Sequence, residues 1–248
     1  MKSLITYHEF SDLDNHLLDQ YRNAIRTAFP EIILNSKVIK NYWDKMETYF
    51  PYTQLFITGA NRELIGFMNA IPIFWDRPLS ELPDDGWDWL VKKGISDFEN
   101  GIQPNSLGGL QIVVTKKFQG KGYSQLLIAR GKQVKENLGF KNFIIPIRPI
   151  LKHIYPEMKM EDYMNWKQDD IAFDPWIRTH IKSGAQILKV CKNSMNVSGD
   201  INFWEDLLKE KIHESGSYRV EGALNFVDIH LKDNYGEYRE ENIWLHYP

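Results

Sequence analysis

Hydrophobic residues recur along the chain at two spacings, and these spacings predict an alternation of strands and helices. Residues 4–10 alternate weakly, which is typical of a strand. Ser11 opens a capping-box-like tetrapeptide that ends at Asp14. Apolar residues then follow at helical spacing over 13–28, and Pro30 ends the helix. The chain is therefore expected to open with a strand and a helix.

The next segment predicts a second helix and a hairpin. Apolar residues at helical spacing begin after Ser36 and stop at Pro51. Two apolar runs, 54–58 and 63–74, flank the turn residues Gly-Ala-Asn-Arg, which is a hairpin signal. Residues 76–106 are less regular and predict only a short helix around Trp87.

The middle of the chain predicts a strand–helix–strand unit. Residues 107–115 form an apolar strand, 123–138 a helix and 142–147 another strand. Gly139 stands where a left-handed helix cap belongs. Such a unit joins two parallel strands.

The second half of the chain begins with a polar, irregular connection over 148–173. Asp174 as N-cap and Pro175 as first helical residue restart a helix, which Gly184 ends. A strand over 185–190, a helix around 203–212 and a strand over 222–231 follow. Since we find no repeat and no linker, we predict one elaborated α/β (α+β) domain over residues 1–248.

Composition narrows the function classes. Hydrophobic residues make up 43% and charged residues 25% of the chain, which is typical of a soluble protein. The net charge of −3 argues against a nucleic-acid partner. No apolar run approaches the roughly 20 residues of a membrane span, and the N-terminus lacks the apolar core of a secretory signal. Cys191 cannot form an internal disulfide, so we expect a cytoplasmic protein.

The most informative segment is the glycine-bearing turn between the strand over 107–115 and the following helix. Glycines bring backbone N–H groups to the surface, and the helix N-terminus favours an anion there. The alternative is a packing turn that binds nothing. A P-loop is excluded because Tyr123 follows Gly122, and a dinucleotide fingerprint is excluded because Gln125 replaces its third glycine.

The sequence from Gln119 to Ser124, Gln-Gly-Lys-Gly-Tyr-Ser, resembles the pyrophosphate-binding motif of the GNAT N-acetyltransferase superfamily. That motif is Gln or Arg, two residues, Gly, one residue, then Gly or Ala, so Ser124 departs from it. Lys116 is a second departure, at a position that is usually proline. The resemblance implies a GNAT-like acyl-CoA N-acyltransferase fold, with a mixed central sheet flanked by helices. It covers a core of about 4–190, and 191–248 would be a C-terminal extension.

The resemblance also implies acetyl-CoA as co-substrate, and no metal. The pantetheine arm would lie beside Ile112 and Val114, with a backbone N–H near Val114 polarising the thioester carbonyl. The pyrophosphate would lie on the backbone of Gln119, Gly120, Lys121, Gly122, Tyr123 and Ser124. The Lys121 side chain would either add charge for phosphate or remain solvated.

His180 occupies the family's tyrosine position four residues before Gly184. Its reference pKa near 6.5 suits a proton donor to the CoA thiolate. The alternative is that it packs with Trp176 and Ile177. A general base stays unassigned between a water relay and the carboxylates of Glu63, Glu161, Asp162, Asp169 and Asp174, the last better explained as a cap.

The acceptor is expected to be the amine of a small molecule. Aromatic residues could form its pocket or belong to the core: Trp75, Trp87, Trp89, Tyr155, Tyr163 and Trp166. Arg148 could bind a substrate carboxylate or a nearby acid. We therefore predict an N-acetyltransferase, with a homodimer as its candidate assembly. The alternatives are an inactive GNAT-fold protein that binds or senses acyl-CoA, and a structural α/β domain.

Overall fold

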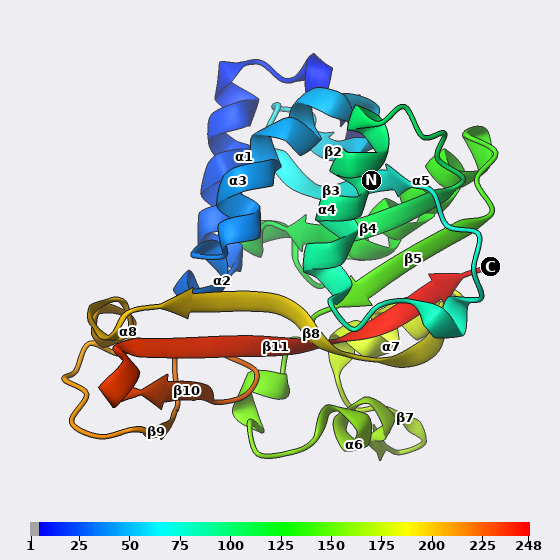
Figure 1. Cartoon of the computed structure of the whole chain (residues 1–248). Helices are drawn as coiled ribbons and strands as arrows, with labels where there is room; N and C mark the ends of the chain where they lie inside the picture. Colours follow the sequence, from blue (N-terminus) through cyan, green and yellow to red (C-terminus); the bar gives the residue numbers. More distant parts are fainter. Residues whose placement is uncertain (1–4) are drawn as a thin grey trace.

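The computed structural model describes residues 5–248, which fold around a mixed sheet (Figure 1). Nine strands make up this sheet, in the order β1-β2-β3-β4-β5-β11-β10-β9, with β8 also paired to β11. A small separate sheet contains β6 (Lys167–Gln168) and β7 (Ile171–Ala172). The main strands are β1 (Ile5–Glu9), β2 (Gln54–Gly59), β3 (Leu64–Ile73), β4 (Ser106–Val114), β5 (Asn142–Ile147), β8 (Gln186–Gly199), β9 (Gly216–Tyr218), β10 (Val227–His230) and β11 (Tyr235–Tyr247).

Helices cover both faces of this sheet. They are α1 (Asn15–Ala28), α2 (Glu31–Leu34), α3 (Lys37–Tyr49), α4 (Gly86–Glu99), α5 (Tyr123–Asn137), α6 (Met160–Asn165), α7 (Pro175–Lys182) and α8 (Ile201–Leu208). On one face, Met46 of α3 and Leu90 of α4 join the core that contains Trp244. On the other face, Leu127 of α5 and Ile177 of α7 join a second core. The expected architecture of a mixed sheet flanked by helices is confirmed.

The central strands β4 and β5 are parallel but stay paired only at their first residues. Residues 106–108 lie opposite 142–144, and no register pairs follow. Gly109 marks the point of divergence, where an added Cβ would lie 2.6 Å from Ile145 Cγ1. On the other side of β4, Asn69 faces Gln111 and Ala70 faces Gly109, so Leu110 is the extra residue of a β-bulge. The two strands therefore open into a gap.

The C-terminal segment is part of the central sheet. β11 pairs with β5 through residues 243–247 and with β8 on its other edge. The boundary expected at residue 190 falls inside β8, and 191–248 supplies an interior strand. The segment expected to extend the sheet or cover the acceptor pocket thus extends the sheet, although its strand beside β5 was not itself expected.

Capping residues, glycines and prolines in the sequence predicted the ends of most helices and strands to within a residue or two of those in the structure. Ser36 caps α3 and Asp174 caps α7, as expected, and Gly139 has a left-handed φ of 67°. The expected cap at Ser11 is wrong: Asp14 accepts the N–H of Leu17 at 3.0 Å, and α1 begins at Asn15. The short helix expected near Trp87 is the longer α4. The first residue of the strand expected over 4–10 lies outside the described residues.

Asp88 in the first turn of α4 is a buried carboxylate at the contact between α4 and β8, and its ionisation provides a test of how closely the two elements pack. Its side chain is buried, Oδ2 accepts the N–H of Asn196 at 3.1 Å, and Oδ1 has no partner among residues 5–248. Burial raises the pKa of Asp88 from 3.8 to about 7. The folded state therefore binds the proton more tightly, and the free energy of unfolding falls as pH rises through this window.

We expect Asp88→Asn to raise the melting temperature at pH 8 and to lose this advantage near pH 4. The amide keeps an acceptor for Asn196 and removes the buried charge, and each kcal/mol recovered adds about 2–4 °C. Thermal melts between pH 4 and 8 measure the effect, with the exposed Asp206→Asn on α8 as matched control. An equal shift at both ends of this range would contradict the interpretation.

Candidate active site

A cavity of about 850 Å³ passes through the gap between β4 and β5. One end is formed by the turn over 118–125, and one side by residues 175, 176, 179 and 180 around α7. The other end lies against α1, α2 and α3, where Trp43 and Trp87 stack with ring centroids 6.2 Å apart. The cavity therefore joins the glycine turn to a largely apolar chamber across the sheet.

The glycine turn has the conformation of an open anion site. Gly120 and Gly122 have φ of 73° and 83°, a region that favours glycine. An added Cβ meets nothing within 4 Å at Gly120 and only Gln125 Oε1 at 3.9 Å at Gly122, so packing does not require either glycine. Gln119 Nε2 donates to Val114 O at 3.0 Å and ties the turn to the end of β4.

The turn leads into the N-terminus of α5. The first hydrogen bond of this helix runs from Leu126 N–H to Gly122 O at 3.3 Å. The N–H groups of a first helical turn have no partner within the helix, and the helix dipole adds positive potential there. Turn and helix together are suited to a phosphate group.

Backbone donors of β4 also face the gap. Thr115 N–H donates to Ile65 O on β3 at 2.9 Å. Because N–H directions alternate along an antiparallel strand, those of Val114 and Ile112 point the other way, toward β5. Pairing with β5 has already ended at Gly108. Backbone N–H groups of β4 therefore line the gap, where they could donate hydrogen bonds to an extended ligand.

The comparisons agree with this geometry. Arginine N-acetyltransferase avaD of Aspergillus versicolor is 25% identical, with the alignment covering 99% of this chain and 93% of the relative. The crystal structure of the loading GNATL domain of CurA from Lyngbya majuscula superposes with a TM-score of 0.65, at 13% identity and 98% and 97% coverage. This chain has the fold of the GNAT acetyltransferase superfamily. No family model matches the chain.

A second GNAT structure has the same overall fold. The GNAT-like decarboxylase GphF, solved with isobutyryl-CoA, superposes with a TM-score of 0.51 at 13% identity, over 98% of each chain. At this identity the likeness concerns the fold alone. The GNAT fold therefore accommodates this chain over nearly its whole length, including β11.

The residues predicted from the GNAT motif come together at the cavity, with one exception. Seven of the residues predicted to bind CoA line it: Ile112, Val114, Gln119, Gly120, Gly122, Tyr123 and Ser124. Lys121 does not line it, and its Nζ donates instead to Lys117 O at 3.1 Å. The Lys121 side chain is exposed to solvent, which is the second of the two alternatives considered for it.

His180 lines the cavity but lies in an unexpected environment. It is fully buried, Nδ1 lies 2.7 Å from the Tyr247 hydroxyl, and Nε2 has no partner among residues 5–248. Burial lowers the pKa of His180 to about 3. The imidazole is therefore neutral at pH 7, and the expectation that its ordinary pKa suits it to donate a proton is wrong in this setting.

Of the seven candidate acceptor residues, Trp87 and Arg148 line the cavity. The other five lie elsewhere: Trp75, Trp89, Tyr155, Tyr163 and Trp166. Trp75 packs edge-on against Trp89, Tyr163 donates to Asp174 Oδ2 at 2.9 Å, and Trp166 stacks on Phe173. None of them lines the cavity, so the core alternative holds for them. Arg148 does line it and also forms an ion pair with Glu240.

Among residues 5–248, no carboxylate candidate for a general base lines the cavity. Among the described residues that line it there is no aspartate or glutamate, so Glu63, Glu161, Asp162, Asp169 and Asp174 all lie outside. Sequence reasoning missed several lining residues, among them Arg22, Trp43, Gln111 and Asn242. Arg22 and Arg26 share a face of α1, which helical spacing could have shown. Asn242 could not be found without recognising β11.

The phosphate site can be tested with a carboxylate that helix α5 tolerates. We expect Ser124→Glu to leave the fold intact, because an acid suits a helix N-terminus, and to weaken CoA binding at least about tenfold by repulsion. Calorimetric titration with CoA measures the dissociation constant. Gln133→Glu adds the same charge on an exposed turn of α5 and should bind CoA like the wild type. Equal CoA affinity in all three proteins would show that the glycine turn does not bind the pyrophosphate.

The environment of His180 can be tested by NMR. We expect its imidazole to stay neutral from pH 8 down to pH 5, because burial opposes the charged form. Nitrogen-15 chemical shifts of the ring, assigned by comparison with His180→Gln, report the protonation state. A titration midpoint between pH 6 and 7 would show that the ring is hydrated and able to carry a proton.

Proposed function

We propose that this protein transfers the acetyl group of acetyl-CoA to the amine of a small molecule, with arginine as the first candidate acceptor. The observation that carries the proposal is the continuous cavity from the glycine turn through the β4–β5 gap to the indole pair. It lets a donor and an acceptor enter from opposite sides and meet within the sheet. Arginine is suggested by the activity of the fungal relative.

The donor would be held by backbone groups along its length. The turn over 119–124 would bind the pyrophosphate, and the N–H groups of Ile112 and Val114 would bind the pantetheine arm as an added strand would. The N–H of Val114, or of a neighbour nearer the Leu110 bulge, would polarise the thioester carbonyl. Such donors stabilise the oxyanion most when they are fixed before reaction.

Proton movements follow from the residues that line the cavity. The amine nitrogen bonds to the acetyl carbon, the carbon–sulfur bond breaks, and the amine loses the proton that the thiolate gains. With no carboxylate among the described lining residues, the amine reacts in its neutral form or loses its proton to water. His180 would act as a neutral imidazole: the Tyr247 hydroxyl donates to Nδ1, and Nε2–H stabilises the leaving sulfur.

The size of the cavity suits these two substrates. A volume of about 850 Å³ lies within the roughly 300–1,000 Å³ typical of small-molecule sites. The indoles of Trp43 and Trp87 offer flat apolar surface on which a planar cation such as guanidinium can stack. A small amine is therefore favoured over a macromolecule.

The proposal predicts release of CoA thiol when acetyl-CoA and arginine are supplied together. A thiol-reactive dye and mass spectrometry of the acetylated product measure the turnover. We expect His180→Ala to lower kcat about 10- to 100-fold, the loss expected for one hydrogen bond to a charged group, with CoA affinity nearly unchanged. Full turnover in this variant would make His180 a packing residue.

Two controls separate the alternatives. Ser124→Glu should lose turnover at low acetyl-CoA and regain it at high concentration. If wild-type protein binds acetyl-CoA and releases no thiol with any amine, it is an acyl-CoA-binding protein without transferase activity. If it fails to bind CoA at all, the glycine turn is a packing turn.

A further inference from the structure

Arginine is the only residue type with a permanent charge among the described residues that line the cavity. The lining residues within the described part of the chain include Arg22, Arg26 and Arg148, and no lysine, aspartate or glutamate. Arg22 is tied to Glu47 through both terminal nitrogens, and Arg26 is exposed, where solvent weakens its attraction. Arg148 differs from both, because it is 20% exposed and follows directly on β5.

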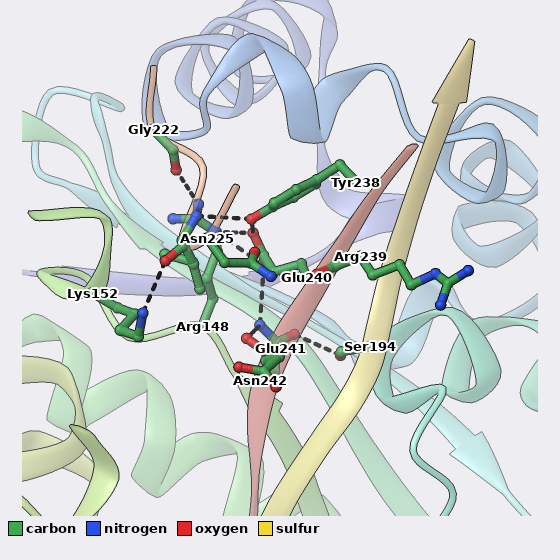
Figure 2. Close-up of polar contacts among 11 residues, drawn as sticks. Arg148, Lys152, Ser194, Gly222, Asn225, Tyr238, Arg239, Glu240, Glu241 and Asn242 are labelled. Atoms are coloured by element: carbon green, nitrogen blue, oxygen red, sulfur yellow. Dashed lines mark hydrogen bonds and ion pairs between the residues drawn. The ribbon is translucent and has the colours of Figure 1, made fainter. Parts of the chain in front are cut away.

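Hydrogen bonds to Glu240 and Gly222 fix the orientation of the Arg148 guanidinium (Figure 2). Its Nε donates to both Glu240 oxygens, at 3.0 and 2.9 Å, and its Nη2 donates to the Gly222 carbonyl. Glu240 is itself fully buried and accepts from Tyr238 Oη at 2.8 Å and Asn242 Nδ2 at 3.0 Å. The guanidinium plane is therefore fixed before any ligand arrives, which reduces the entropy lost on binding.

This arrangement leaves most of the guanidinium donors unused. Arginine has five N–H donors, and the contacts above occupy the Nε–H and one Nη2–H. The two Nη1–H groups and the second Nη2–H have no partner among residues 5–248. Donors in this forked geometry match the two oxygens of a carboxylate. The arginine therefore combines a fixed orientation, a cavity-lining position and free donors.

We propose that Arg148, positioned by Glu240, binds a carboxylate of the acceptor, so that the substrate class is an amine that also carries a carboxylate, such as an amino acid. The inference rests on the proposed function and adds to it the group by which the acceptor is selected. Asn242 lies beside Arg148 in the same wall, and its amide bonds to Glu240 and to the Ser194 hydroxyl. Cationic amines without a carboxylate find no acid in the described lining of the cavity.

The experiment compares acceptors that differ only in this group: arginine with agmatine, lysine with cadaverine, and tryptophan with tryptamine. We expect wild-type kcat/KM to favour the carboxylate-bearing member of each pair that is acetylated by about 10- to 100-fold. Arg148→Gln should reduce this ratio to near one, chiefly through the KM of the amino acid. Arg148→Lys should recover little of it, because an ammonium lacks the fork.

Arg239→Gln is the matched control. It removes the same charge from the residue beside Glu240, but Arg239 is exposed and pairs with Glu237 outside the cavity. The ratio in this variant should equal that of the wild type. Because each ratio is taken within one protein, partial unfolding of a variant changes both acceptors alike and leaves the ratio informative.

Glu240→Gln tests the positioning role. It keeps acceptors for Tyr238 and Arg148 but removes the charge that orients the guanidinium, so we expect the acceptor KM to rise while kcat at saturation changes less. Preference for the decarboxylated amines, or an unchanged ratio in Arg148→Gln, would overturn the inference and leave the proposed function intact. CoA binding without acetylation of any of these amines would instead overturn the proposed function, and the inference with it.

Discussion

The incomplete pairing of β4 with β5 is the constraint on which the site depends. Two parallel strands that stayed paired along their length would use each other's backbone groups and leave no space between them. Here the bulge at Leu110 and the close approach at Gly109 end the pairing after Gly108. Backbone groups of the rest of β4 are left to face a cavity, and buried backbone groups require a partner. The fold thus leaves backbone N–H groups of β4 for which an extended ligand can supply hydrogen-bond acceptors.

The acceptor wall is stabilised by a different kind of interaction. A buried carboxylate such as Glu240 is costly unless it is paired and fully hydrogen-bonded. Its partners are Arg148 at the end of β5 and two residues of β11, Tyr238 and Asn242. Arg148 in turn donates to the carbonyl of Gly222, so the wall joins segments that are far apart in the sequence. Figure 2 shows Arg148, Tyr238 and Asn242 converging on Glu240. The geometry of this wall therefore exists only when the sheet is complete.

The parts that could be predicted from sequence are those with local causes. Ser36, Asp174 and the glycine turn act within a few residues, and a hairpin needs only adjacent strands. β11 was missed because its pairing with β5 and β8 leaves no local signature. Pocket and core could not be distinguished for the candidate aromatics, because a tryptophan such as Trp75 or Trp87 looks the same in sequence whether it faces a core or a cavity. The pKa of His180 depends on burial, which spacing along a helix does not reveal.

The central place of β11 has a consequence for how the chain acquires its structure. β1 to β5 are synthesised well before β11, and at about 5–20 residues per second the ribosome needs several seconds to pass from one to the other. During that interval the edge of β5 has no neighbour, and an open strand edge favours pairing with other chains. Pairing of β11 with β5 covers this edge (Figure 1). Because Ile243 lies opposite Ile147, the same pairing brings Asn242 next to Arg148. The same strand pairing thus covers the edge of β5 and completes the acceptor wall.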